Sequence, residues 1–354
     1  MSPALPPIRH GGNLLAAVRR YGRAEADWLD LSTGIHPDGY PVPALPASAW
    51  RRLPQDGDGL AELAAEAFGA PQALPVAGSQ AAIRTLPGLL RPGRVGIAAL
   101  GYSEYAPAFA ASGHTVVLLD EADFARADLA DALDHLVVVN PNNPTARLLP
   151  PATLLHWHAA LAGRGGTLLV DEAFIDCLPA ASVAAHSGAE GLAVLRSIGK
   201  FYGLAGIRCG FVLAHQPLLD ALHERLGHWT VSGPARAAAR HALADRQWQE
   251  ANRAQLGVSG ARLGTLLARH GLTAVVHPLF CWVPHADALT LHEALAHHGV
   301  WTRYFEAAGG CLPSLRLGLP PDRPECWQRL DAALAALAAL SAPSAPSAPS
   351  AVSA

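Results

Sequence analysis

The chain has 354 residues, of which 51% are hydrophobic and 16% are charged, and its formal net charge is −3. This apolar content excludes a disordered protein and is enough to bury the core of one large and one smaller domain. The negative charge disfavours a protein that tracks nucleic-acid phosphates. No apolar run is long enough for a membrane span, and residues 1–9 lack a signal-peptide pattern, so we expect no membrane partner.

Cysteine and lysine usage add two constraints. The five cysteines are scattered, odd in number and never spaced as C-x-x-C, which predicts reduced thiols and a cytoplasmic location. Of 26 basic residues, 25 are arginine and one, Lys200, is lysine. Because arginine keeps its proton in proteins, Lys200 is the candidate for chemistry that needs a side-chain amine. A stray surface lysine is the alternative, and its neighbours must decide.

The predicted elements fall into two parts. Residues 1–55 are rich in Pro and Gly and predict few regular elements, and a helix follows over 58–70. Strands are then expected at 94–100, 114–119, 136–140, 166–171, 192–196 and 209–214, with helices at 103–112 and 151–162. This alternation predicts the α/β class, with a mainly parallel sheet covered by helices on both faces and a ligand crevice at the carboxyl ends of its strands.

The pattern changes after residue 215. Helices are expected at 217–226, 234–253, 259–270, 289–298 and 324–340, with short strands at 273–276 and 315–317. This predicts a smaller α+β domain. The last residues, 341–354, form a Ser-Ala-Pro repeat without core-forming side chains, which predicts a disordered tail.

Two polar residues follow buried strands. Asp171 ends the strand GTLLVD, where its carboxylate could face a protonated ring nitrogen, although a helix cap or a structural ion pair would use it equally well. Asn143 lies in NPNNPT, which holds three of the five asparagines of the chain. Its amide could hydrogen-bond a ligand oxygen, although a plain turn is the ordinary use of Asn and Pro.

Two further segments suit a phosphate. Gly78, Ser79 and Gln80 form a small-residue turn that enters a helix, where free N–H groups could hold phosphate or Ser79 could act only as a cap. The segment RSIGKFYGLAGIRCG places Lys200 between Ser197 and Arg208, a hydroxyl and a guanidinium that suit a phosphate.

One cofactor accounts for all of these groups. Pyridoxal 5′-phosphate has an aldehyde for a Schiff base with Lys200, a phosphate for Gly78, Ser79, Ser197 and Arg208, a ring nitrogen for Asp171 and a ring hydroxyl for Asn143. Tyr102 is placed to stack on the ring. We therefore predict Lys200, Asp171 and Tyr102 as the catalytic residues, with the ring as an electron acceptor.

These motifs resemble those of fold-type I pyridoxal-phosphate enzymes, the class I/II aminotransferases, in order and spacing over residues 8–340. The resemblance implies an N-terminal arm (1–45) that joins the small domain and the active site, a large cofactor-binding domain (46–215) with a sheet of the seven-stranded type, and a small C-terminal domain (216–340). It also implies a homodimer.

Two branches of this family handle phosphorylated substrates. The segments HGGN (10–13), WLDLSTGIHP (28–37) and DEAFID (171–176) are similar to the branch that decarboxylates L-threonine O-3-phosphate to (R)-1-amino-2-propanol O-2-phosphate in cobalamin biosynthesis. The other branch transaminates histidinol phosphate and is the alternative. A non-catalytic protein of the same fold is a further alternative, against which the intact Lys200, Asp171 and Asn143 argue.

The resemblance also implies a substrate site. Arg316 in SLRLGL would hold the α-carboxylate, and Arg303 in GVWTRYF, with His10, would face the substrate phosphate. The remaining substrate-side residues implied are Gly11, Gly34 and Asn143. The chain departs from the family at four positions, where it has Gly34 and His36 in place of asparagine, and Leu53 and Phe174 in place of tyrosine.

A zinc enzyme is a further alternative, because the chain has 17 histidines. The close pairs are His156-x-His158 and His297-His298, and no acidic or cysteine ligands accompany them at a metal-binding spacing. We therefore predict no metal site.

Overall fold

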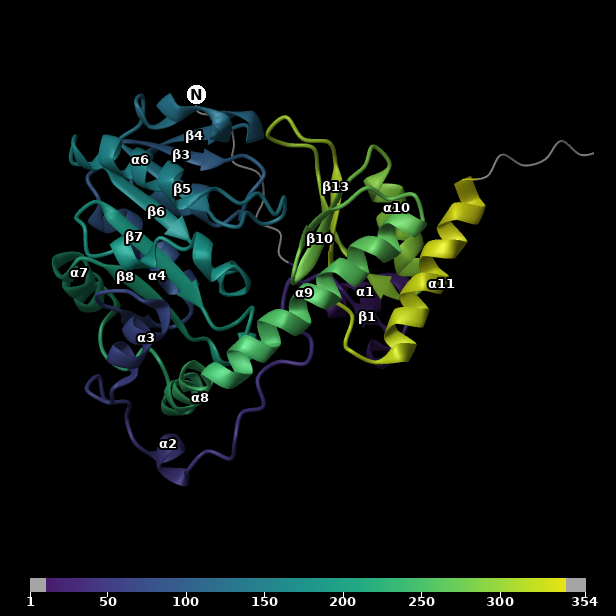
Figure 1. Cartoon of the computed structure of the whole chain (residues 1–354), viewed down its shortest axis with the longest axis horizontal. Coiled ribbons are helices and arrows are strands. Elements are labelled where there is room, and N and C mark those ends of the chain that lie inside the picture. The colour runs from purple at the N-terminus through teal and green to yellow at the C-terminus, as the bar shows by residue number, and fades with distance from the viewer. Residues whose placement is uncertain (1–10, 342–354) are drawn as a thin grey trace, which may run out of the picture.

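The computed structural model describes residues 11–341, which form two lobes (Figure 1). The larger lobe is built on a seven-stranded sheet with the order β2-β8-β7-β6-β5-β3-β4. Strands β4, β3, β5, β6 and β7 are parallel, whereas β8 runs antiparallel to β7 and β2. The strands are β2 (Leu74–Val76), β3 (Arg94–Ala98), β4 (Thr115–Leu119), β5 (His135–Val139), β6 (Thr167–Asp171), β7 (Leu192–Ser197) and β8 (Gly210–Ala214).

Both faces of this sheet are buried, because successive strand residues point to opposite sides and both sets are apolar. Leu136 and Val138 share one core with Trp157, whereas Val137 and Val139 share another with Phe109. The first face is covered by α3 (Leu60–Phe68), α6 (Pro151–Ala162) and α8 (Gly233–Ala244), and the second by α4 (Ser79–Thr85), α5 (Tyr105–Ala111) and α7 (Gln216–Leu226). The predicted α/β layering is therefore present.

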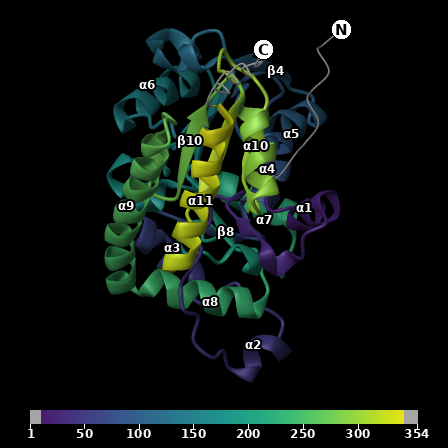
Figure 2. The ribbon, with the colours of Figure 1, turned by 90° about the vertical axis from the view of Figure 1, so that its right-hand side faces the viewer.

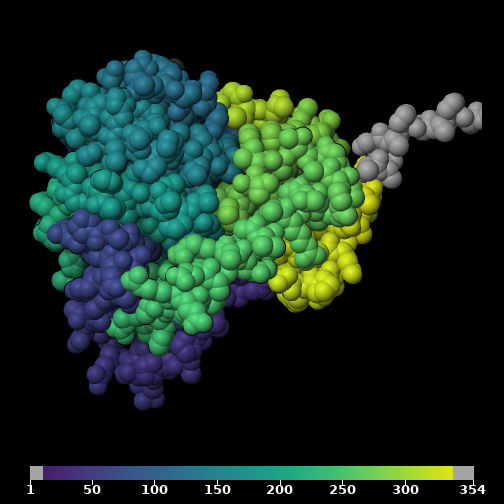
Figure 3. Space-filling view, viewed as in Figure 1, coloured from purple at the N-terminus to yellow at the C-terminus, as the bar shows by residue number. Residues whose placement is uncertain are grey.

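The smaller lobe contains a four-stranded antiparallel sheet with the order β12-β13-β10-β9. Its strands are β9 (Val275–His277), β10 (Phe280–Pro284), β12 (Arg303–Phe305) and β13 (Ser314–Gly318). Figure 2 shows the helices of this lobe, α9 (Arg246–Arg269), α10 (Ala288–His297) and α11 (Pro324–Ser341), on the side turned toward the viewer. On the surface view, the green residues of α8 and α9 extend from the large lobe to the small one (Figure 3).

The N-terminal segment contains more structure than the sequence predicted. Helix α1 (Leu14–Tyr21) begins where the Asn13 side chain accepts the Ala16 N–H at 3.2 Å and ends at Gly22 in the left-handed region. Strand β1 (Leu29–Asp30) pairs in parallel with β11 (Val300–Trp301), and α2 (Ala47–Arg51) follows. The expectation of few regular elements here missed α1, although an Asn cap and a terminal Gly are its ordinary signals.

The helix boundaries after residue 233 differ from those predicted. The sequence predicted helices at 234–253 and 259–270, whereas α8 ends at Ala244 and α9 runs unbroken from Arg246 to Arg269. The break falls at Asp245 because its carboxylate accepts the Trp248 N–H at 3.0 Å and so caps α9. Strands β10 and β12 were also missed. The predicted tail lies outside the described residues except for Ser341, and the predicted domain boundaries stay predictions.

Within the described part of the chain, no helix combines the length and apolar character needed to cross a membrane.

Candidate active site

A cavity of about 110 Å³ lies at the carboxyl ends of β5, β6 and β7. This is the edge of a parallel sheet at which ligand sites are expected, because the loops that leave the strands converge there. The structure brings together in its wall all nine residues predicted to hold the cofactor: Gly78, Ser79, Gln80, Tyr102, Asn143, Asp171, Ser197, Lys200 and Arg208. Residues from five separate segments of the chain therefore share one site.

At one end of the cavity lie the groups suited to a phosphate. Gly78 has φ +73°, and a Cβ atom there would lie 2.7 Å from Nη2 of Arg208, so only glycine allows the guanidinium to come this close. The Arg208 guanidinium is steadied by a hydrogen bond from Nη1 to the Ala205 carbonyl at 3.2 Å. The Ser197 hydroxyl accepts the Gly199 N–H at 3.2 Å. Together with the α4 N-terminus at Ser79, these donors fit a dianion.

The carboxylate of Asp171 lies in the wall of the cavity and is nearly inaccessible to solvent. Its Oδ1 accepts the Ala173 N–H at 3.0 Å, and its Oδ2 accepts the Tyr105 hydroxyl at 2.7 Å. Burial raises the pKa of Asp171, and the hydrogen bonds from Tyr105 and Ala173, with the charge of Lys200, oppose that rise. A carboxylate held in this way fits a protonated ring nitrogen.

Lys200 shares the cavity with Asp171, and its Nζ lies 5.6 Å from the centre of the Phe174 ring. Desolvation lowers the pKa of Lys200 to about 8, with the positive charges of Arg316 and Arg208 adding to the effect and Asp171 opposing it. An amine of this pKa is neutral in a useful fraction of molecules near neutral pH, and the neutral amine is the form that attacks an aldehyde. The surroundings of Lys200 therefore favour a Schiff base over a stray surface lysine.

A second cavity, of about 370 Å³, adjoins the first, and Tyr102 and Asn143 line both. The second cavity also receives Gly11, Arg303 and Arg316, three of the residues implied for substrate. Arg303 and Arg316 face each other across the antiparallel pair β12–β13. The site thus places two guanidinium groups beside the proposed cofactor cavity, an arrangement suited to a substrate with two anionic groups.

Arg316 is buried and held from two sides. Its Nη1 donates to Asn143 Oδ1 at 2.5 Å, and its Nη2 donates to the Ser32 carbonyl at 2.5 Å. Burial, with the neighbouring charge of Arg303, lowers the pKa of Arg316 to about 9. A cation desolvated in this way is stabilised by an incoming carboxylate.

Two implied substrate residues are placed differently. Gly34 lines neither cavity: a Cβ atom there would lie 2.9 Å from Cε1 of Phe174 and 3.1 Å from Cδ1 of Phe280. Gly34 thus lies against Phe174, which does line the cofactor cavity. His10 lies outside the described residues. The tyrosine-to-leucine departure at Leu53 leaves an exposed side chain. At the other departure, the Nε2 of His36 donates to Asn252 Oδ1 at 2.7 Å, and its Nδ1 accepts the N–H groups of Asp38 and Gly39.

Sequence reasoning missed Tyr105 and Ser32. Tyr105 follows Tyr102 by three residues at the start of α5, so its position beside the sheet edge was visible, but its contact with Asp171 was not. Ser32 contributes its backbone carbonyl to Arg316, and a backbone contact between segments so far apart in the chain leaves no mark in the side-chain pattern.

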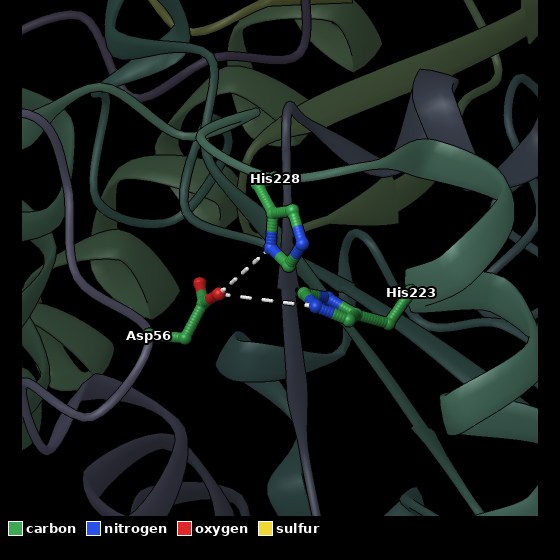
Figure 4. Close-up of side chains that lie close together, drawn as sticks. All are labelled: Asp56, His223 and His228. Carbon is green, nitrogen blue, oxygen red and sulfur yellow. Dashed lines mark ion pairs between the residues drawn. The ribbon is translucent and has the colours of Figure 1, made fainter.

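Among the described residues, one group of three potential metal ligands lies close together, and it contains neither of the histidine pairs at 156–158 and 297–298. Figure 4 shows it: Asp56 Oδ2 lies 3.8 Å from His223 Nε2 and 3.7 Å from His228 Nδ1. Two ligand atoms of one tetrahedral zinc ion would lie about 3.3 Å apart, given bonds of about 2.0 Å. The observed separations from Asp56 Oδ2 are longer than this. The other carboxylate oxygen of Asp56, Oδ1, lies 4.0 Å from Nη1 of Arg236. We interpret the group as a surface cluster of polar side chains.

Comparisons with known proteins find relatives of this chain in sequence and in fold. A threonine-phosphate decarboxylase from Pseudomonas aeruginosa is 52% identical over 92% of this chain and 97% of its own length. A threonine-phosphate decarboxylase from a Sinorhizobium species is 42% identical over 89% of this chain and 94% of its own. The histidinol-phosphate aminotransferase of Sinorhizobium meliloti, solved with pyridoxal 5′-phosphate, superposes with a TM-score of 0.76 at 20% identity, covering 97% of this chain and 98% of that one.

These findings confirm the predicted fold, which the solved structure shares, and the predicted cofactor. The model of the family described as aminotransferase class I and II matches residues 53–325. That range contains the NPNNPT, VDEAF and RSIGKFYGLAGIRCG motifs and both substrate-side arginines. The chain therefore belongs to the class I and II aminotransferase family of pyridoxal-phosphate-dependent enzymes.

Proposed function

We propose that this protein is a pyridoxal-phosphate-dependent carboxy-lyase that converts L-threonine O-3-phosphate to (R)-1-amino-2-propanol O-2-phosphate, a reaction of cobalamin biosynthesis. The observation that carries the proposal is the pair of adjacent cavities, which share Tyr102 and Asn143 in their walls. One contains the amine of Lys200 and the carboxylate of Asp171, and the other contains the guanidinium groups of Arg303 and Arg316. The identity of 52% and 42% with threonine-phosphate decarboxylases supports the substrate.

The residues of the first cavity fit the cofactor. Arg208, Ser197 and the Gly78–Ser79 turn would hold its phosphate, Asp171 its ring nitrogen, Asn143 its ring hydroxyl and Tyr102 the face of its ring. Asn143 would do this with its amide N–H, because Arg316 already occupies its Oδ1. When bound, pyridoxal 5′-phosphate supplies an electron-accepting ring conjugated to the substrate Cα.

The protein's own groups would direct which bond at Cα breaks. Arg316 would bind the α-carboxylate and Arg303 the substrate phosphate, which fixes the rotation of the substrate about the bond from Cα to its amine. This orientation would direct cleavage to the Cα–carboxylate bond, and the carboxylate would leave as carbon dioxide. Lys200 Nζ would hold the proton that then returns to Cα, so atoms and charge balance without an added oxidant or oxo acid.

The decisive experiment is carbon dioxide release from O-phospho-L-threonine by the purified, cofactor-loaded protein without any 2-oxo acid. Catalytic release that is lost in Lys200→Ala is the expected result. Conversion of the cofactor to its amine form by histidinol phosphate, with no release of carbon dioxide from O-phosphothreonine, would contradict the proposal and favour the aminotransferase.

We extend the proposal to a homodimer. Trp50 and Leu53, at α2, and Trp229, before α8, expose 68%, 66% and 59% of their surface, and α2 and α8 are in contact. Neighbouring exposed apolar side chains of this size are typical of an interface. Trp50→Glu with Trp229→Glu is expected to produce a monomer in sedimentation velocity, whereas Val258→Glu, an equally exposed site on α9, is not. A wild-type monomer at micromolar concentration would contradict this part.

The proposal also includes a cytoplasmic location. All five cysteines, Cys177, Cys209, Cys281, Cys311 and Cys326, are unpaired, which supports a reducing compartment.

A further inference from the structure

The hydroxyl of Tyr105 meets the carboxylate that we assign to the cofactor's ring nitrogen. Tyr105 begins α5 in the large lobe, Asp171 ends β6, and the distance from Oη to Oδ2 is 2.7 Å. Tyr105 is fully buried, and Asp171 is 4% exposed. A hydrogen bond to a charged group in a site that excludes water is stronger than one at the surface.

The second oxygen of Asp171 accepts the Ala173 N–H at 3.0 Å. Each carboxylate oxygen can accept two hydrogen bonds, so a direction on the carboxylate stays available for a ring N–H in the cavity. The titratable side chains whose electrostatic interactions involve Asp171 include Lys200, Tyr102 and Tyr105. Tyr105 is the one among them that is hydrogen-bonded to it.

We propose that Tyr105 is a positioning residue, whose hydroxyl holds Asp171 ionised and oriented so that it keeps the cofactor's ring nitrogen protonated. Burial and the neighbouring Asp171 raise the pKa of Tyr105 well above its usual value, so the phenol remains a donor at any working pH. Without this donor, Asp171 would keep only the Ala173 N–H and the charge of Lys200 against the cost of its burial. The ring nitrogen would then lose its proton more easily, and the ring would accept electrons less well.

A purely structural role for Tyr105 is the competing explanation, because its ring packs against Tyr102, with the ring centres 6.1 Å apart. Tyr105→Phe separates the two, since it keeps the ring and removes only the hydroxyl. We expect the dissociation constant for pyridoxal 5′-phosphate to rise about tenfold, the loss that corresponds to one charge-assisted hydrogen bond at the lower end of the usual range. In an Asp171→Ala background, the same change is expected to alter the constant less than about twofold.

The spectroscopic readout is the chemical shift of cofactor labelled with ¹⁵N in its ring, bound to each variant. The wild-type shift should be that of a protonated pyridine, and Tyr105→Phe should move it toward the neutral ring. Tyr21→Phe is the matched control, because it removes a hydrogen bond of the same kind, from Tyr21 to Glu293 at 2.6 Å, outside the cavity. It should change neither the shift nor the affinity.

An unchanged ¹⁵N shift in Tyr105→Phe, or an equal loss of affinity in both backgrounds, would overturn the proposal. If Tyr105→Phe fails to fold by circular dichroism, 3-fluorotyrosine at position 105 keeps the hydroxyl as a stronger donor. The shift should then stay at that of the protonated ring, and a shift toward the neutral ring would overturn the proposal. The inference rests on the cofactor site of the proposed function but needs no substrate. Cofactor binding without carbon dioxide release would therefore reject the decarboxylase and leave this test standing.

Discussion

Arg316 of the small lobe and Asn143 of the large lobe meet in one hydrogen bond, from Nη1 to Oδ1 at 2.5 Å. The contact joins β13 to the loop after β5, and both residues line the second cavity. A group bound by Arg316 therefore lies next to the amide that we assign to the cofactor's ring hydroxyl. The position of the small lobe and the geometry of the reaction are linked through this contact.

Arg316→Lys tests the arginine end of this contact. Lysine keeps the charge but loses the planar fork that reaches Asn143, Ser32 and a carboxylate at once. We expect kcat/KM for O-phosphothreonine to fall about 100-fold or more, which corresponds to about 3 kcal/mol, with little change in the absorbance of the bound cofactor. The measurement is carbon dioxide release at subsaturating substrate.

Arg246→Lys is the control for that substitution, because Arg246 is exposed and paired with Glu66 at 2.6 Å away from the cavities. It should leave kcat/KM within about twofold, as is usual for an exposed ion pair. A decrease of less than about threefold in Arg316→Lys would remove Arg316 from the substrate site.

The lowered pKa of Lys200 predicts how fast the cofactor-free protein takes up pyridoxal 5′-phosphate at different pH values. With a pKa of about 8, the neutral amine rises from about 10% at pH 7 to about 90% at pH 9. The rate of the absorbance change on mixing should therefore rise about tenfold and level off. An ordinary lysine would give about a 100-fold rise with no plateau. Nα-acetyl-lysine, measured in parallel, corrects for the titration of the cofactor itself.

Two buried histidines predict loss of stability in acid. Burial lowers the pKa of His277 to about 3 and that of His292 to about 4. The unfolded chain therefore binds protons below pH 6.5 that the native protein does not, and stability falls as pH falls. Each histidine should reduce the free energy of unfolding by about 2 to 3 kcal/mol between pH 7 and 4.5.

Urea titrations across this pH range measure the effect. His292→Gln can keep a hydrogen bond to Thr302, which His292 contacts at 2.8 Å. This substitution should reduce the slope of the free energy of unfolding against pH by the amount that corresponds to about one proton. The exposed His156→Gln should not change it. If the free energy of unfolding has the same slope against pH in His292→Gln and in the wild type, His292 does not contribute to the loss of stability in acid.

The sequence predicted the cofactor cavity better than the substrate cavity, for a physical reason. Asp171, Asn143 and Ser197 each follow or end a strand of one parallel sheet, and such positions converge at one edge whatever the rest of the fold does. Arg303 and Arg316 become neighbours only through the antiparallel pairing of β12 with β13. That register depends on packing between distant segments, and β12 and β10 were not visible as strands, so the pair rested on family resemblance alone.

Local side-chain chemistry explains the remaining differences in the fold. Asp245 ends one helix and caps the next, whereas the apolar pattern runs through it without a break. Tyr105 reads as a core aromatic at the start of a helix, and only the placement of α5 against the end of β6 shows that its hydroxyl meets Asp171. Hydrogen bonds between distant segments do not follow the hydrophobic periodicity of helices and strands, so that periodicity cannot predict them.

Gly78 provides the sharpest test of the phosphate end of the cavity. Its φ of +73° makes any side chain unfavourable, and a Cβ atom would also displace the Arg208 guanidinium, whose Nη2 would lie 2.7 Å away. Gly113 separates these effects, because it has φ +85° and a Cβ atom there would meet nothing within 4 Å. Gly78→Ala and Gly113→Ala should each lose about 1 to 2 kcal/mol of stability from backbone strain.

Only Gly78→Ala should weaken the binding of pyridoxal 5′-phosphate, by about tenfold or more, because only there is a charged phosphate contact displaced. Equilibrium dialysis of the cofactor and urea unfolding of the cofactor-free protein measure the two quantities separately. Equal loss of cofactor affinity in both variants would mean that backbone strain alone is responsible and that Arg208 does not bind the phosphate. Unchanged affinity in both would place the phosphate elsewhere in the cavity.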